Sequence, residues 1–246
     1  MKTTRYSVLD AIRGLALFSM ILYHAVWDLV YIFHFPWNWY QSTGAFLWQQ
    51  SICFTFIILS GFCQPLGRHR TKRGLVVFFA GFLISAATIL IMPQNRVLFG
   101  VLTLIGSCML LILPLENILQ KCSPVSGWIL SILLFILIRI SDWSSISALI
   151  QPLRIRHPLI DLFFSYLGLP SANFYSTDYF PLFPWIFLFL SGYYLYHIFL
   201  KWNLLRYLKH SFLKPLEWIG SHTLIIYMLH QPVLYGLFTL ILNTNG

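Results

Sequence analysis

The chain has 246 residues, of which 58% are apolar and only 9% are charged, and its mean hydropathy is +0.74. This composition excludes an ordinary water-soluble protein and predicts an integral membrane protein. The formal net charge of +9 does not indicate a nucleic-acid partner, because the basic residues lie in short segments beside apolar runs and no nucleic-acid motif is present. We find no repeat, linker or change of composition, so residues 1–246 are expected to form a single transmembrane domain.

Apolar runs recur along the whole chain and predict an all-α bundle of about seven membrane-spanning helices. Several of these runs are near the roughly 20 residues that a helix needs to cross the hydrocarbon core. The predicted spans are 8–33, 44–64, 74–92, 97–119, 125–141, 180–200 and 218–242. The span at 125–141 is short, and 158–169 is compatible with a re-entrant or interfacial helix, so six or eight spans also remain open.

The distribution of Lys and Arg predicts the orientation, because these residues favour the cytoplasmic side of short loops. Seven spans with the N-terminus in the cytoplasm and the C-terminus outside put most basic loop residues inside, as in a bacterial cytoplasmic membrane. The inside set is Lys2, Arg5, Arg68, Arg70, Lys72, Arg73, Lys121, Lys201, Arg206, Lys209 and Lys214, and the outside set is Arg96, Arg139, Arg154 and Arg156.

Four ionisable residues lie in the first predicted span: Asp10, Arg13, His24 and Asp28. At about 100° per residue, a helix places all four within an arc of about 60°. A charge at the bilayer centre costs about 2.5–3.5 kcal/mol on insertion scales. Such a stripe therefore needs partners, a water-filled cavity or a function.

The spacing within this stripe suggests two local pairs. Asp10 and Arg13, at i and i+3, can form an ion pair near the start of the helix. Asp28 lies four residues after His24, where its carboxylate could orient the imidazole and leave the other ring nitrogen as a base. The alternative is that the charged residues only anchor the helix ends and that His24 is a hydrogen-bonded packing residue.

Candidate residues also occur in later segments. His230, in YMLHQP at 227–232, has a predicted depth similar to that of His24, so the two could meet; the alternative is a histidine bonded to a backbone carbonyl. The run GRHRTKR at 67–73, with Arg68 and Arg70, could bind phosphates, although the cytoplasmic bias of basic residues also explains it. Asp178, Tyr179 and Trp185 lie in the stiff, proline-containing stretch TDYFPLFPW, which could bind an acceptor or form an interfacial aromatic belt. The histidines and cysteines have no metal-ligand spacing, so no metal is expected.

The first span resembles that of the heparan-α-glucosaminide N-acetyltransferase catalytic-domain family, within the wider membrane acyltransferase superfamily. The likeness rests on Arg13 and His24, with ten residues between them, on Asp10 before the arginine and on Gly14 directly after it. It continues in FTFIILSGF at 54–62, FGVLTLIG at 99–106, TDYFPLFPWIFLFLSGYYL at 177–195 and IGSHTLIIYMLHQP at 219–232. The resemblance implies transfer of an acyl group, usually acetyl from cytosolic acetyl-CoA, to an amine or hydroxyl of a carbohydrate presented across the membrane.

We therefore predict a membrane acyltransferase with His24, Arg13, Asp28 and His230 as catalytic residues. Asp10, Arg13, Arg68 and Arg70 are the candidates for binding acetyl-CoA, and Asp178, Tyr179 and Trp185 are those for binding the acceptor. His24 would act as the base or handle the acyl group, and Asp28 would orient it. Arg13 would stabilise the negative charge that develops on the thioester or CoA side during acyl transfer. The rival hypothesis is a transporter or a non-catalytic binding or assembly subunit that uses the same polar stripe.

Overall fold

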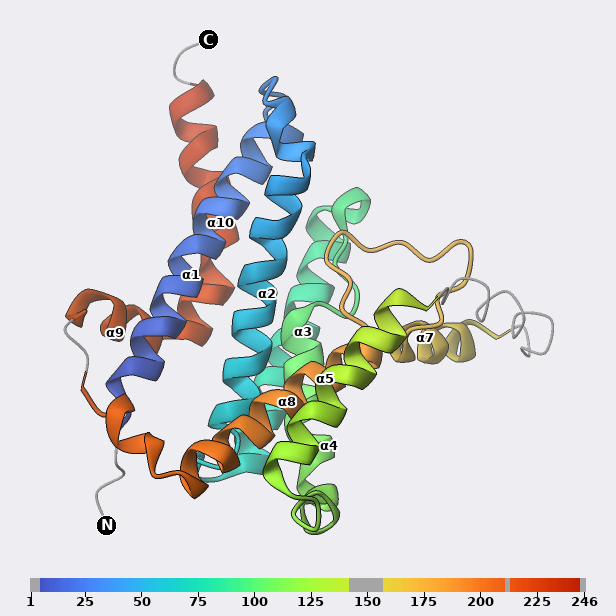
Figure 1. Cartoon of the computed structure of the whole chain (residues 1–246). Helices are drawn as coiled ribbons and strands as arrows, with labels where there is room; N and C mark the ends of the chain where they lie inside the picture. Colours follow the sequence, from blue (N-terminus) through green and yellow to red (C-terminus); the bar gives the residue numbers. More distant parts are fainter. Residues whose placement is uncertain (1–4, 142–156, 211–212, 244–246) are drawn as a thin grey trace. The chain divides into compact units, whose positions relative to one another are not determined.

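The computed structural model describes residues 5–141, 157–210 and 213–243, and these residues form helices and connecting loops without a β-strand (Figure 1). The predicted all-α architecture is confirmed. The α-helices are α1 (Ser7–Trp27), α2 (Thr43–Cys63), α3 (Arg70–Ile91), α4 (Val101–Leu119), α5 (Pro124–Ile140), α7 (Pro158–Leu167), α8 (Leu182–Lys201), α9 (Lys214–Ser221) and α10 (Thr223–Asn243). Lys2, Arg154 and Arg156, which entered the charge distribution above, lie outside the described residues.

Within the described residues, six helices are long and apolar enough to cross a membrane: Ser7–Ile32, Thr43–Cys63, Arg70–Ile91, Val101–Leu119, Leu182–Lys201 and Thr223–Leu242. The first of these includes a π-helical turn, Asp28–Ile32, that continues α1. Two shorter apolar helices, α5 and α7, correspond to the short span and to the interfacial segment expected from the sequence. The prediction of about seven spans is therefore close.

One boundary differs clearly from the prediction. The segment 218–242 was expected to be a single helix, but the chain forms the short helix α9, turns at His222 and then begins α10 at Thr223. Helix α9 starts with Pro215 in its first turn, where the missing N–H costs no hydrogen bond. It buries Glu217 and Gly220 and leaves Trp218 exposed, so it is an amphipathic helix separate from the last span.

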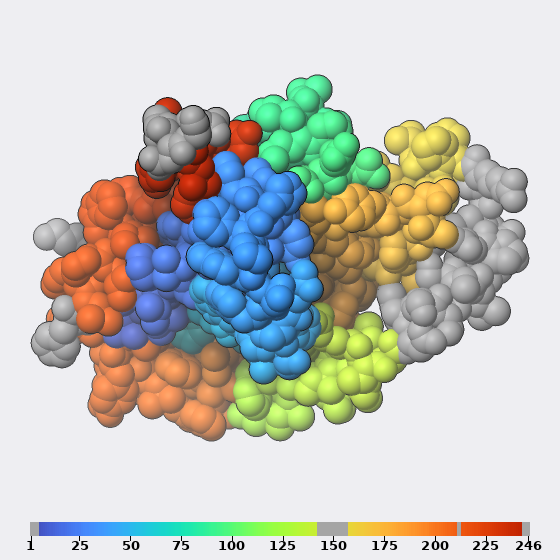
Figure 2. Space-filling model, turned by 90° about the horizontal axis from the view of Figure 1, so that it is seen from above, coloured from blue at the N-terminus to red at the C-terminus, as the bar shows by residue number. Residues whose placement is uncertain are grey.

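The chain divides into two compact units, and α2 begins in the first and ends in the second. Unit 1 comprises Met1–Phe56 and Asn203–Gly246, and unit 2 comprises Ile57–Trp202. In unit 1, α1 packs against α2, α9 and α10 around a core of Ala16, Leu17, Met20, Ile52 and Phe56. The residues that join α1 to α2, together with the start of α2, cover one end of this unit and appear in bright blue in Figure 2.

Helices α1 and α10 run in the same direction. Tyr227, near the start of α10, packs against the core around Leu17, and Tyr235 lies farther along beside Phe33, with 6.3 Å between the ring centroids. This register brings the middle of the first span against the middle of the last one. The polar residues of the two spans are therefore placed side by side.

Helix α9 lies unusually close to the first half of α1 (Figure 1). A Cβ atom added to Gly14 would lie 2.0 Å from the carbonyl oxygen of Leu216, and one added to Gly220 would lie 1.8 Å from that of Asp10. Only glycine allows two backbones to approach in this way. The two glycines thus fix α9 against the segment of α1 that carries Asp10 and Arg13.

Unit 2 consists of packed helix pairs. Helices α3 and α4 are antiparallel, because Gly74 approaches Leu110 and Gly81 approaches Thr103. Helices α5 and α8 are also antiparallel, with the ring of Phe135 5.5 Å from that of Trp185. The end of α2 crosses α8 without intervening side chains at two reciprocal contacts, Gly61 with Phe189 and Gly192 with Ile58.

Candidate active site

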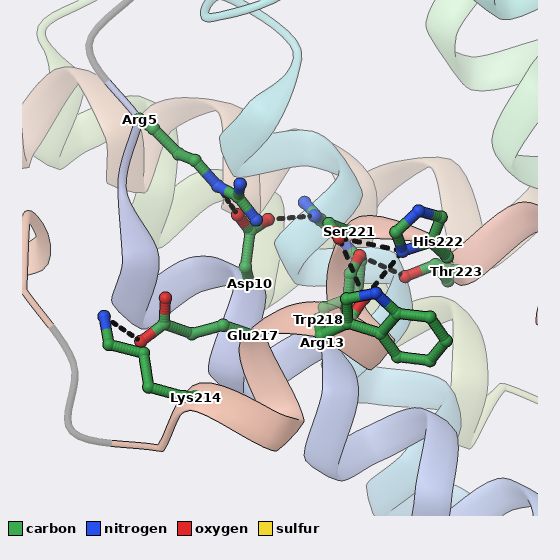
Figure 3. A network of polar contacts seen from close by, with 10 residues as sticks. Arg5, Asp10, Arg13, Lys214, Glu217, Trp218, Ser221, His222 and Thr223 are labelled. Atoms are coloured by element: carbon green, nitrogen blue, oxygen red, sulfur yellow. Dashed lines mark hydrogen bonds and ion pairs between the residues drawn. The ribbon is translucent and has the colours of Figure 1, made fainter.

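The start of α1 carries a charged cluster that Figure 3 shows at close range. The carboxylate of Asp10 accepts a hydrogen bond from Arg13 at 2.9 Å and another from Arg5 at 2.8 Å. The ion pair expected from the i, i+3 spacing of Asp10 and Arg13 is therefore confirmed. Two guanidinium groups share one carboxylate, so the cluster keeps a net positive charge.

Helix α9 contributes a second set of polar groups to this region. Glu217 is buried and lies 3.3 Å from the ammonium of Lys214, while the imidazole of His222 lies 2.9 Å from the carbonyl oxygen of Trp218 (Figure 3). Glu217 belongs to α9 and His222 to the turn that follows it, because the helix is interrupted before Thr223.

The imidazoles of His24 and His230 meet between α1 and α10, with 4.9 Å between their ring centroids. The equal depths of the two residues had suggested this contact. Nδ1 of His230 is hydrogen-bonded to the carbonyl oxygen of Tyr227, and Nε2 is buried without a hydrogen-bond partner among the described residues. Because a carbonyl only accepts, Nδ1 carries the proton and Nε2 presents a lone pair.

Asp28 is fully buried at the start of the π-helical turn, with no exposed surface. Its Oδ1 accepts a hydrogen bond from the side-chain amide of Gln231, and its Oδ2 has no partner among the described residues. The predicted hydrogen bond from the His24 imidazole to the Asp28 carboxylate is not formed among the described residues. The helix widens at Asp28, and the carboxylate is directed to α10 instead.

Sequence reasoning missed Gln231. The available signal was its position, since an amide that directly follows His230 in an apolar span is itself a buried polar group in need of a partner. Its partner, Asp28, is 203 residues away in the sequence, and local spacing rules cannot identify it. Two polar contacts therefore join α1 to α10: His24 with His230, and Asp28 with Gln231.

Asp178 lies in unit 2, where the segment before α8 runs alongside the segment before α4. The N–H of Phe180 donates to the carbonyl of Phe99 at 2.9 Å, and that of Thr177 donates to Arg96 at 3.1 Å. The partly buried carboxylate of Asp178 accepts the N–H of Val101 and so caps α4, the helix of the neighbouring segment. Burial raises the pKa of Asp178 to about 6, while the Val101 hydrogen bond opposes the shift.

The other two acceptor candidates have different surroundings. The hydroxyl of Tyr179 donates to the carbonyl of Ser165 in α7, and burial raises the pKa of this phenol. Trp185 is only 4% exposed, and its ring lies between Phe180 at 4.9 Å and the guanidinium of Arg139 at 4.9 Å. Asp178 and Tyr179 are thus held on one rim of unit 2, whereas Trp185 packs in its core.

The two candidate cations of the basic run, Arg68 and Arg70, have different surroundings. Arg70, at the start of α3, forms an ion pair with Glu116 of α4 at 2.8 Å. Arg68 is exposed in the preceding loop. In the described part of the chain, no group of three or more His, Cys, Asp or Glu side chains could hold a metal ion.

The fold and the site define an integral membrane protein whose first and last spans place two imidazoles, a carboxylate and an amide against each other. The family profile described as "Heparan-alpha-glucosaminide N-acetyltransferase, catalytic" matches residues 5–232, nearly the whole chain. The chain therefore belongs to this family, and it is a membrane transferase by that membership. No match was found among the curated proteins or the solved structures.

Proposed function

We propose that the protein transfers an acetyl group from cytosolic acetyl-CoA to an amine or hydroxyl of a carbohydrate-type acceptor. The observation that carries the proposal is the contact of His24 with His230 between two membrane spans, since acyl transfer needs a group that moves a proton at the reacting centre. Family membership favours acetyl as the group transferred. Asp28 is buried one turn after His24 and accepts a hydrogen bond from Gln231, so in this proposal it helps to hold α10 beside the imidazole of His24.

The charged cluster at the start of α1 is the proposed entry for the CoA portion of the donor. Arg13 lies eleven residues before His24, about 16 Å along the helix. This separation suits a cation that binds the CoA side of an extended donor while the thioester reaches His24. Asp10 would hold Arg13 in place. Arg68 and Arg70 are the further candidates for binding the CoA phosphates, and the charge distribution predicts that their loop is cytoplasmic.

Asp178 and Tyr179 are the proposed groups for recognising the acceptor on the other side, with Trp185 as the stacking residue for a sugar ring. A carboxylate and a phenol on a rim are suited to binding hydroxyl or amine groups of a sugar. Burial of Trp185 means that its contact with the acceptor requires rearrangement of the residues that cover it. The cytoplasmic placement of the N-terminus and of the basic loops follows from the charge distribution.

The test is release of free CoA thiol from acetyl-CoA by purified protein in proteoliposomes, with amino sugars as candidate acceptors. The wild-type protein should release thiol only when an acceptor is present, and His24→Ala should abolish the release while retaining the fold. His222→Ala is the matched control, because His222 is exposed and bonds a backbone carbonyl of α9. Normal turnover by His24→Ala would refute the assignment, and acceptor uptake without thiol release would support a transporter.

A further inference from the structure

The hydrogen bond between His230 and Tyr227 fixes one tautomer of the His230 imidazole. The proton on Nδ1 is held by a backbone carbonyl one turn earlier on the same helix, and the lone pair on Nε2 is left buried without a partner among the described residues. An imidazole fixed in this way is prepared to accept a proton at a single atom. A packing histidine would be expected to satisfy both of its ring nitrogens.

His24 has no comparable restraint. Neither of its ring nitrogens forms a hydrogen bond within the described residues, and the carboxylate that could have oriented it, Asp28, is bonded to Gln231. The Asp28–Gln231 contact therefore holds the carboxylate away from His24. Within the part of the chain that the structure describes, His230 is the one of these two imidazoles with a hydrogen bond that sets its orientation and tautomer.

We infer that His230 is the general base of the transfer, and that the Tyr227 carbonyl is its positioning group. This inference rests on the proposed function and assigns His24 to the acyl side of the site. The acceptor's N–H or O–H bond breaks as its proton moves to Nε2 of His230, and the freed electron pair forms the bond to the acyl carbon. The carbon–sulfur bond then breaks with its electron pair on sulfur, and the thiolate takes the proton from the imidazolium.

Two nucleophiles distinguish a base from an acyl-handling residue. Glucosamine needs a base to lose a proton during attack, whereas hydroxylamine is a strong neutral nucleophile that depends much less on one. His230→Ala should lower kcat with glucosamine by about 10²–10⁴-fold, the usual contribution of general base catalysis, and leave much of the rate with hydroxylamine. His24→Ala should lose the rate with both nucleophiles, and His222→Ala should lose neither.

A second readout follows the tautomer directly. Nitrogen NMR of the protein carrying isotope-labelled histidine should contain one signal pair of the Nδ1-protonated form that disappears in His230→Gln and persists in His222→Gln. Added imidazole should also restore part of the glucosamine activity of His230→Ala, which a merely structural role would not allow.

The outcomes separate the inference from the proposed function. If the wild-type protein transfers acetyl groups but His230→Ala and His24→Ala lose the same factor with both nucleophiles, the inference is overturned and the function stands. An Nε2-protonated His230 would also overturn it. If the wild-type protein acetylates neither nucleophile, the proposed function fails and the inference fails with it.

Discussion

The contact between α1 and α9 predicts that Gly14→Ala destabilises the protein. The added Cβ would lie 2.0 Å from the carbonyl oxygen of Leu216 and 3.1 Å from the backbone nitrogen of Gly220. Ordinary contacts of a Cβ atom begin at 3.4 Å, so the oxygen must withdraw by 1.4 Å (3.4 minus 2.0). Because both opposing atoms are backbone, no side-chain rotation can relieve the overlap, and α9 must move away from α1.

The expected magnitude combines two opposing effects. Overpacking a well-packed contact costs about 1–3 kcal/mol and occasionally more. Replacing glycine by alanine inside a helix gains about 1 kcal/mol from helix propensity. In Gly14→Ala the steric cost should exceed this gain, since a whole helix is displaced. In Gly236→Ala only the gain remains, because a Cβ there meets nothing within 4 Å.

The assay is thermal unfolding of the two purified variants in the same detergent, with Gly236→Ala as the matched control in α10. A chain of this size shifts its midpoint by about 2–4 °C per kcal/mol. Gly14→Ala should therefore unfold several degrees below the wild type, and Gly236→Ala at or above it. Equal midpoints for the two variants would refute the close approach of α9 to α1.

Three further predictions concern other parts of the chain. The pKa of Asp178 is raised from 3.8 to about 6, so between these pH values the unfolded chain binds fewer protons than the folded one, and the stability of the wild type should fall as the pH rises. Thermal unfolding of Asp178→Asn between pH 4 and pH 8 should lack this fall. The same variant should be impaired in its use of the acceptor. Gln231→Leu leaves the buried carboxylate of Asp28 without its donor and should cost about 1.5–3 kcal/mol in thermal unfolding. Much of this loss should be recovered by Asp28→Asn in the double variant, and additive losses would contradict the pairing. A membrane-impermeant maleimide should label the exposed Cys122 only from the cytoplasmic side of vesicles. In a Cys122→Ser background, the cysteine of Ala172→Cys should be labelled only from outside. The reverse pattern would contradict the proposed orientation.

The sequence predicted those features that depend on one helix at a time. The lengths of the apolar runs located the spans, since the hydrocarbon core imposes a length on any helix that crosses it. The i, i+3 spacing predicted the Asp10–Arg13 pair, because neighbours on one helix face are determined by helix geometry alone. The sequence also predicted that His24 and His230 lie at a similar depth, and the two imidazoles do meet. Depth alone does not reveal which helices are neighbours.

Features that depend on contacts between distant segments were not predictable in this way. The i, i+4 spacing of His24 and Asp28 suggested a local pair, but Gln231 competes for the same carboxylate from another helix. Asp178 was considered only within its own segment, TDYFPLFPW, yet it caps α4, 77 positions earlier at Val101 (178 minus 101). A single sequence contains the local alternatives but not the tertiary partner that decides between them.

The directions of the helices in unit 2 bear on whether α5 crosses the membrane. Helices α4 and α8 run the same way, because Phe99 before α4 pairs with Phe180 before α8, and Leu119 at the end of α4 accepts from Tyr194 in the second half of α8. Two spans of the same direction require an odd number of crossings between them. Helix α7 has only 10 residues, about 15 Å, whereas the 17 residues of α5 extend about 26 Å, close to the thickness of a thin bilayer core. Helix α5 also runs antiparallel to α8, so among the described helices between α4 and α8 it is the one whose length and direction suit a further crossing.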